Sequence, residues 1–109
     1  MGETPKTALA HLSSDELRTS RDPGAPKEKL SRAFNAIVQY NQQQENPKQM
    51  WRINTHILQQ LTGCFNSSVQ QFVRQHQGAI AEHNQQFNLT TVRHNAIHKG
   101  LDPNQFIQW

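Results

Sequence analysis

Three histidines near the C-terminal end have the residue type and spacing of metal ligands. His94 and His98 stand one helical turn apart, and His83 could approach them from a preceding helix. The zinc-protease motif requires a glutamate next to its first histidine, and Asn95 occupies that position here. A nuclease of the HNH type would need a pair of strands, and the sequence indicates none. We therefore predict structural or capping roles for these histidines, with no catalytic residue, metal site or cofactor, and keep a metal-dependent nuclease as the weakest hypothesis.

Contact with nucleic acid is the second chemistry that the composition suggests. The net charge is +3, and the excess lies in residues 46–109, where five Lys and Arg face two acids, whereas residues 1–45 are neutral. Fifteen Gln and nine Asn accompany this bias. Amides offer donors and acceptors together, which suits phosphates and base edges. An amide-rich surface facing solvent is the alternative interpretation.

The spacing of residues 55–76 is typical of a helix-turn-helix, in which a short helix, a turn with glycine and a longer helix follow one another. Gly63 supplies the turn, and Cys64, Val69 and Phe72 follow it at the spacing that packs a second helix onto Leu58 of the first. We expect Cys64 to be a buried small side chain rather than a nucleophile.

Two residues depart from the usual helix-turn-helix pattern. Gln59 occupies a position where a small residue lets the helices approach, and Thr62 one where an apolar residue is common. An ordinary helical hairpin is therefore the alternative. If the motif binds DNA, its second helix presents polar residues to the groove and nearby cations to the phosphates. The predicted DNA-binding residues are Arg52, Asn66, Ser67, Ser68, Gln70, Gln71, Arg74, Arg93 and Lys99.

Four short strings carry a resemblance to a known family. They are Met50 to Ile53, Leu61 to Cys64, Ile80 to Asn84 and Arg93 to Asn95. With these strings, residues 25 to 109 resemble a small helix-turn-helix module of cyanobacterial plasmid-associated proteins, some of them described as protelomerases (telomere resolvases). The resemblance implies DNA binding. Protelomerase catalysis uses a tyrosine nucleophile in a much longer chain, and the only tyrosine here, Tyr40, lies in an amphipathic helix, so recombinase activity is not implied.

Hydrophobic periodicity predicts the helices that must position these residues. A helix follows Pro26 and ends among residues 41–46, because Pro47 disfavours helix before it. A short helix begins at a Thr55 cap and ends at Gly63. Residues 50–53 are either extended or one helical turn, with Trp51 in the core.

The C-terminal half holds the longest predicted helix. It starts at a cap among residues 66–68 and runs to about Phe87, with a bend or break at Gly78. Asn88 and Thr90 mark a turn, a short helix covers residues 91–98 before Gly100, and the tail packs back on the core. No alternation typical of strands is visible.

The length of 109 residues allows one small domain, so we predict an all-α helical domain over residues 26–109 after a flexible N-terminal arm, residues 1–25. Within the arm, Ser13 and Glu16 have the spacing of a capping box. Hydrophobic residues make up only 34% of the chain, which disfavours a deep active site. No apolar run is long enough for a membrane span or a signal peptide, which favours a cytoplasmic protein without a membrane partner.

We therefore predict a non-catalytic protein that binds double-stranded DNA in plasmid or telomere replication, recombination or transcription regulation. Because one helix-turn-helix contacts few base pairs, we expect a homodimer or a larger protein partner. The alternative is a small helical protein-interaction module, or a regulator of a larger replication or recombination protein, that uses Phe106, Ile107 and Trp109.

Overall fold

The computed structural model describes residues 12–89 and 94–109, and these residues form helices and no strand, as predicted for an all-α fold. The α-helices are α2 (Ser14–Thr19), α3 (Ala25–Gln42), α4 (Thr55–Thr62), α5 (Asn66–Gln75) and α6 (Gln77–Gln86). Three short 3-10 helices are η1 (Pro47–Gln49), η2 (His94–His98) and η3 (Pro103–Gln105).

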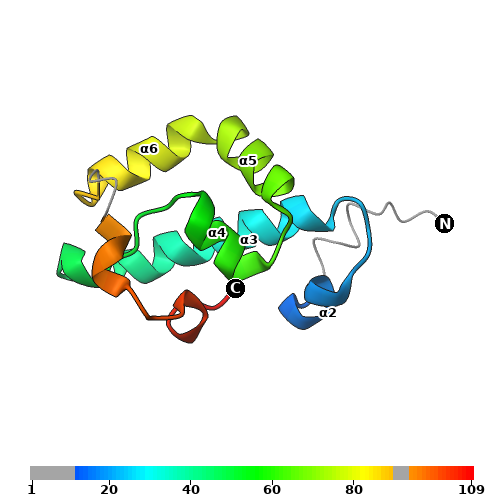
Figure 1. The fold of residues 1–109 in the computed structure, drawn as a ribbon, viewed down its shortest axis with the longest axis horizontal. Coiled ribbons are helices and arrows are strands. Elements are labelled where there is room, and N and C mark those ends of the chain that lie inside the picture. Colours follow the sequence, from blue (N-terminus) through cyan, green and yellow to red (C-terminus); the bar gives the residue numbers. More distant parts are fainter. Residues whose placement is uncertain (1–11, 90–93) are drawn as a thin grey trace.

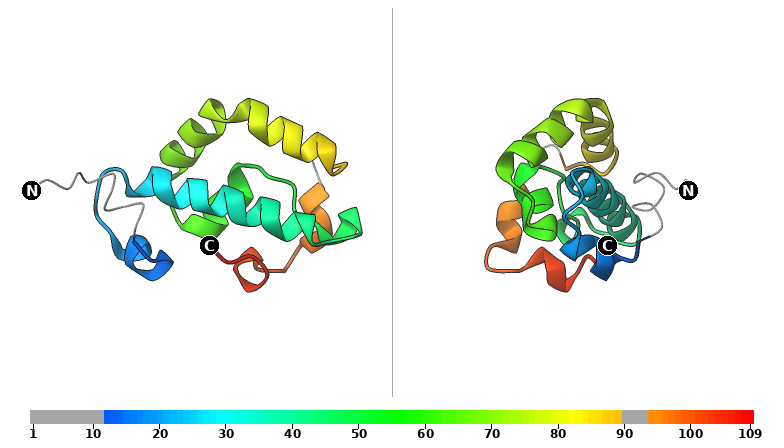
Figure 2. Two further views of the ribbon diagram at one scale, coloured as in Figure 1. Left: turned by 180° about the vertical axis from the view of Figure 1, so that it is seen from behind. Right: turned by 90° about the vertical axis from the view of Figure 1, so that its right-hand side faces the viewer.

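The helices form layers around α3, which runs along the length of the molecule (Figure 1). α5 and α6 pass over one side of α3 and α4, and the segment that contains η2 and η3 closes the opposite side (Figure 2). α5 lies toward the end at which α3 begins, and η2 lies toward the end at which α3 finishes. α4, in the middle, contacts α3, α5 and η3.

The sequence of α3 explains its length and its buried face. Pro26 occupies its first turn, where a missing N–H costs nothing. Leu30, Ala33 and Ile37 follow at helical spacing and are fully buried. The helix ends at Gln42, before Pro47, as predicted.

One hydrophobic cluster joins α3, α4 and α5 with the ends of the chain. Trp51 is 4% exposed and belongs to this cluster, although residues 50–53 are extended rather than helical. The cluster also confirms the apolar positions inferred around the turn. Its buried members are Leu30, Ala33, Ile37, Trp51, Ile53, Ile57, Leu58, Leu61, Cys64, Val69, Phe72, Ile80 and Ile107.

The segment that we expected to be a flexible arm contains helix α2. Its capping box is present, since the Ser13 hydroxyl accepts from the Glu16 amide and the Glu16 carboxylate accepts from the Ser13 amide. Leu17 is fully buried beside Ala25 and Trp109. The residues before 12 lie outside those described, and a boundary at residue 25 stays a prediction.

Two predicted helix starts are wrong by about one residue. Asn54, not Thr55, caps α4 by accepting from the Ile57 amide, because an extended residue must precede the first helical one. Helix α5 has Phe65 at its cap position and no side-chain cap, so Asn66 is already helical rather than its cap.

The long C-terminal helix is interrupted at His76, not at Gly78. His76 leaves helical geometry, with φ −117° and ψ 23°, and its imidazole Nδ1 lies 2.9 Å from the Phe72 carbonyl. A side chain that competes for a carbonyl of the preceding turn favours such a break. The turn predicted at Asn88 is present, with φ 60°, and η2 covers the described part of the helix predicted over residues 91–98. Thr90 and residues 91–93 lie outside the described ranges.

The C-terminal tail packs on the core, as predicted. Ile107 is 2% exposed, and the Trp109 indole N–H donates to the Leu61 carbonyl at 2.8 Å. The Asn104 amide donates to the Gln60 carbonyl at 2.9 Å. Both carbonyls belong to the last turn of α4, where intrahelical partners are missing. The tail therefore caps α4 as well as filling the core.

We expect Ile107→Ala to lower the free energy of unfolding by about 2–5 kcal/mol, because it leaves a cavity against α4. Phe106→Ala is the matched control, since Phe106 is 43% exposed and loses less contact. Urea denaturation followed by circular dichroism measures both. Equal losses for the two variants would show that the tail does not pack as described.

Candidate nucleic-acid interface

Helices α4 and α5 are joined by the short turn 63–65. Gly63 adopts the left-handed conformation, with φ 68° and ψ 12°, and its amide donates to the Gln59 carbonyl at 2.7 Å. Leu58, Val69 and Phe72 are buried between the helices and α3, which is the packing that the spacing predicted. The sequence from 55 to 76 therefore forms two packed helices with a tight turn.

The two residues that depart from the usual motif build this turn. The Thr62 hydroxyl donates to the Leu58 carbonyl at 2.7 Å and accepts from the Cys64 amide at 3.2 Å. The Gln59 amide donates to the Cys64 carbonyl at 3.4 Å. Cys64 is 8% exposed and its thiol lies 3.9 Å from the Pro26 carbonyl, so it is a buried contact with α3. Polar side chains thus satisfy the backbone of the turn.

Helix α5 turns a polar face to solvent. Its exposed or half-buried side chains are Asn66, Ser67, Ser68, Gln70, Gln71 and Arg74, all among the predicted DNA-binding residues. Positions 67, 70, 71 and 74 recur every three or four residues, so their side chains share one face. Arg74 forms no ion pair among the described residues.

The electrostatic surroundings of α5 favour an anion. The sequence contains no acidic residue between Glu45 and Glu82, a range that includes all of α4 and α5. Helix α5 has no side-chain cap, so the first amides of the helix point to solvent without a side-chain acceptor. Both features favour negative charge at the start of α5.

The other predicted phosphate contacts lie elsewhere. Arg52 is in the extended segment before α4, and its backbone pairs with Asn95 of η2. Its side-chain Nε is buried and has no hydrogen-bond partner among the described residues. Lys99 is exposed and directly follows η2. These two residues are thus grouped near η2, toward the other end of the molecule from α5 (Figure 1). Arg93 lies outside the described residues.

Three asparagines fix the extended segment that leads into α4. Asn41 of α3 donates to the Trp51 carbonyl at 2.8 Å and accepts from the Trp51 amide at 3.0 Å. Asn95 pairs with both backbone groups of Arg52 at 2.7 and 2.8 Å. Each asparagine replaces one residue of a neighbouring strand, although the described residues contain no sheet.

The third member of this asparagine clamp is Asn84 of α6. It accepts from the Ile53 amide at 3.0 Å and donates to the Ile53 carbonyl at 3.1 Å. Residues 51–53 are therefore hydrogen-bonded in succession to α3, η2 and α6. Because Asn54 then caps α4, the asparagine clamp sets where α4 begins and so helps position α5.

His83 joins two members of the clamp. Its Nδ1 lies 3.1 Å from the Asn84 Oδ1, which only accepts, so Nδ1 carries the proton. Its Nε2 then accepts from the Asn41 amide at 3.1 Å. This network fits only a neutral imidazole. Burial lowers the pKa of His83 below its ordinary value of 6.5, and the hydrogen bond to Asn84 opposes that shift in part.

The other two histidines of the sequence cluster also contact backbone. The Nε2 atoms of His94 and His98 donate to the Met50 carbonyl at 3.0 and 2.8 Å. The His98 ring stacks on Trp51 with centroids 4.1 Å apart. Within residues 12–89 and 94–109, no three His, Cys, Asp or Glu side chains are grouped so that they could hold a metal ion.

Sequence reasoning missed the asparagine clamp and one cation. Asn41 and Asn84 are buried, but an amide at a helical position gives no local signal of such a contact. Lys27 was counted in a half of the chain with no net charge, whereas the fold places it beside Ser68, Gln71 and Gln75 of α5.

No family model, curated protein or solved structure matches this chain. The resemblance to protelomerase-associated modules therefore stays a prediction. No helix within the described ranges combines the length and apolar character needed to cross a membrane.

We expect Asn84→Ala to lower the free energy of unfolding by about 2–5 kcal/mol, because the buried N–H and C=O of Ile53 lose their partner. Asn35→Ala, at an exposed position of α3, should change it by less than about 0.5 kcal/mol. Chemical denaturation of both variants tests this. A loss no larger for Asn84→Ala than for Asn35→Ala would contradict the clamp.

The neutral His83 predicts a pH dependence of stability. The unfolded chain binds a proton at His83 below about pH 6.5, whereas the folded chain does so only at lower pH. The contribution of His83 is therefore constant above pH 6.5, and stability falls as the pH drops from 6.5 toward the lowered pKa. We expect His83→Gln to reduce this slope in urea titrations at pH 7.5, 6.5 and 5.5. The same slope in both proteins would show that another group causes it.

Proposed function

We propose that this protein binds double-stranded DNA without catalysis, with α5 as the helix that enters the major groove. The observation that carries the proposal is the solvent face of α5, which presents amides, hydroxyls and one free arginine without an acidic residue. A groove-binding helix needs this combination, because amides and arginine pair with base edges and acids would repel the phosphates.

The exposed positions of α5 divide by chemistry. Gln70 and Gln71 can pair with adenine through both amide groups, and Arg74 can pair with guanine or contact a phosphate. Ser67, one turn before Arg74, offers a hydroxyl. The amides at the start of the helix favour a phosphate there. These contacts require no movement of the core, since none of the four side chains is buried.

A role in plasmid or telomere replication, recombination or transcription regulation is the wider form of this proposal, and it rests on the resemblance of the sequence alone. DNA binding would require a cytoplasmic location in a bacterial cell. The separate group formed by Arg52 and Lys99 remains a predicted contact with phosphates. A homodimer would double the number of base pairs contacted by α5.

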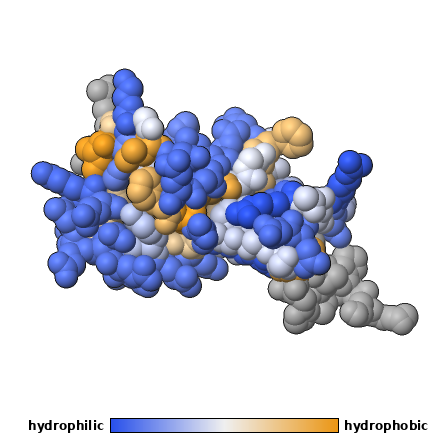
Figure 3. Space-filling view, turned by 90° about the horizontal axis from the view of Figure 1, so that it is seen from below, coloured by the Kyte–Doolittle hydropathy of each residue, from blue (hydrophilic) through white to orange (hydrophobic). Residues whose placement is uncertain are grey.

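A second candidate function is protein interaction, though not through the residues first expected. Ile107 is buried and Trp109 bonds to α4, so only Phe106 of the predicted tail contacts remains exposed. Figure 3 shows hydrophobic side chains gathered on one face of an otherwise hydrophilic surface. Phe106 and Leu101, 43% and 46% exposed, line a hollow of about 310 Å³ that also contacts Trp51. This hollow favours the interaction module.

Fluorescence anisotropy of labelled duplex DNA at two salt concentrations tests the proposal. Binding that weakens steeply with salt is expected, because displaced counterions drive association with phosphates. Absence of binding at low salt by the folded chain would reject DNA binding and favour protein interaction.

We expect Arg74→Ala to weaken binding and to reduce the slope of log affinity against log salt by about one. Lys48→Ala is the matched control, because Lys48 is an exposed cation of η1, away from α5. Unchanged affinity and slope for Arg74→Ala would place the recognition surface elsewhere.

A further inference from the structure

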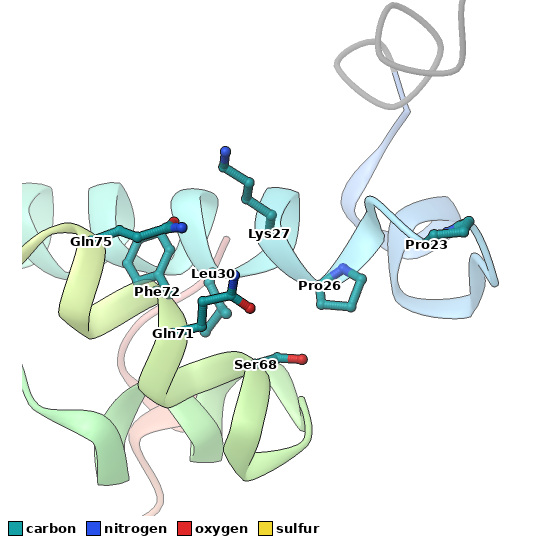
Figure 4. A pocket seen from close by; sticks show the side chains of 8 residues that line it. All are labelled: Pro23, Pro26, Lys27, Leu30, Ser68, Gln71, Phe72 and Gln75. Carbon is teal, nitrogen blue, oxygen red and sulfur yellow. The ribbon is translucent and has the colours of Figure 1, made fainter.

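A hollow of about 200 Å³ lies between the first turns of α3 and the adjoining side of α5. Its polar wall consists of Lys27 from α3 and Ser68, Gln71 and Gln75 from α5, and Leu30 and Phe72 lie beneath them. Figure 4 shows Lys27 extending outward from α3, at the rim of the hollow, and the two glutamines on the α5 side. The hollow therefore offers one cation and several neutral polar groups.

The charge of Lys27 is not compensated within the described part of the chain. Lys27 is exposed and forms no hydrogen bond or ion pair there. The acid next to it, Glu28, pairs with Arg32 at 2.9 Å. The Asp22 carboxylate accepts from the Gly24 amide at 2.8 Å. No acidic side chain lines the hollow, so it favours an anion over a neutral or cationic ligand.

The position of the hollow relative to α5 indicates which anion. An α-helix with its side chains is about 10–12 Å wide, and the major groove of B-DNA is about 12 Å wide. A helix in the groove therefore has a phosphate backbone along each side. Ser68, Gln71 and Gln75 follow one another along the side of α5 that faces α3, next to the outward face that carries Arg74.

We propose that the hollow between α3 and α5 receives the phosphodiester backbone of one DNA strand, with Lys27 as its cationic contact. Ser68, Gln71 and Gln75 would donate hydrogen bonds to the same stretch of phosphates. This inference rests on the proposed function of α5. It adds a contact that holds the helix in register in the groove, since phosphate contacts position a protein without selecting sequence.

Lys27→Ala tests the assignment in the full chain, with Lys48→Ala as the charge-matched control. The slope of log affinity against log salt should fall by about one for Lys27→Ala. Between 50 and 200 mM salt the variant should therefore lose about threefold less affinity than the parent protein. Its binding should also weaken by the same factor on duplexes of different sequence. Circular dichroism and urea denaturation should show an unchanged fold, because the side chain is exposed.

The outcomes separate this inference from the proposed function. An unchanged slope for Lys27→Ala, with a reduced slope for Arg74→Ala, would overturn the phosphate contact and leave α5 as the DNA-binding helix. Equal reductions for Lys27→Ala and Lys48→Ala would overturn the assignment to this hollow. No binding by the folded parent protein at 50 mM salt would overturn both.

Discussion

The fold depends on how the extended segment before α4 satisfies its backbone. Trp51 and Ile53 are buried, so their N–H and C=O groups must find partners inside the protein. The described residues form no sheet that could supply them, and asparagine side chains do so instead, one for each of three successive residues. The result ties α3, α6 and η2 to one short segment. Removing any of the three leaves both backbone groups of one residue without a protein partner.

This arrangement explains the unusual amide content of the chain. Asn41 and Asn84 are buried, whereas no glutamine is buried. Asparagine has a short side chain with one fewer rotatable bond, so holding it against a neighbouring backbone costs less conformational entropy. Glutamines lie on the surface, where Gln70 and Gln71 remain available to a partner. The two amides thus serve different parts of the molecule, the interior and the proposed interface.

Local patterns in the sequence predicted the elements but not the contacts between distant ones. The spacing of Leu30, Ala33 and Ile37 was enough for α3, and Gly63 was enough for the turn, because both depend on neighbours within a few residues. Asn84 bonds a residue 31 positions away, and Asn95 one 43 positions away, so no local period reveals them. The break at His76 was displaced from Gly78 because a side-chain contact, not glycine's flexibility, determines it. Most predicted contacts on α5 share one surface, but Arg52 and Lys99 do not join them.

The distribution of charge shows why counting by position in the chain misses part of the interface. Residues 1–45 are neutral in sum, yet Glu28 is paired with Arg32 and the Asp22 carboxylate accepts from a backbone amide, so these acids oppose Lys27 only weakly. α3 carries Lys27 to the side of α5, whose own sequence has no acid. The unpaired cations at this end of the molecule therefore come from both halves of the chain. Electrostatic attraction depends on distance in space, and α3 and α5 are brought together by the same core that the asparagine clamp completes.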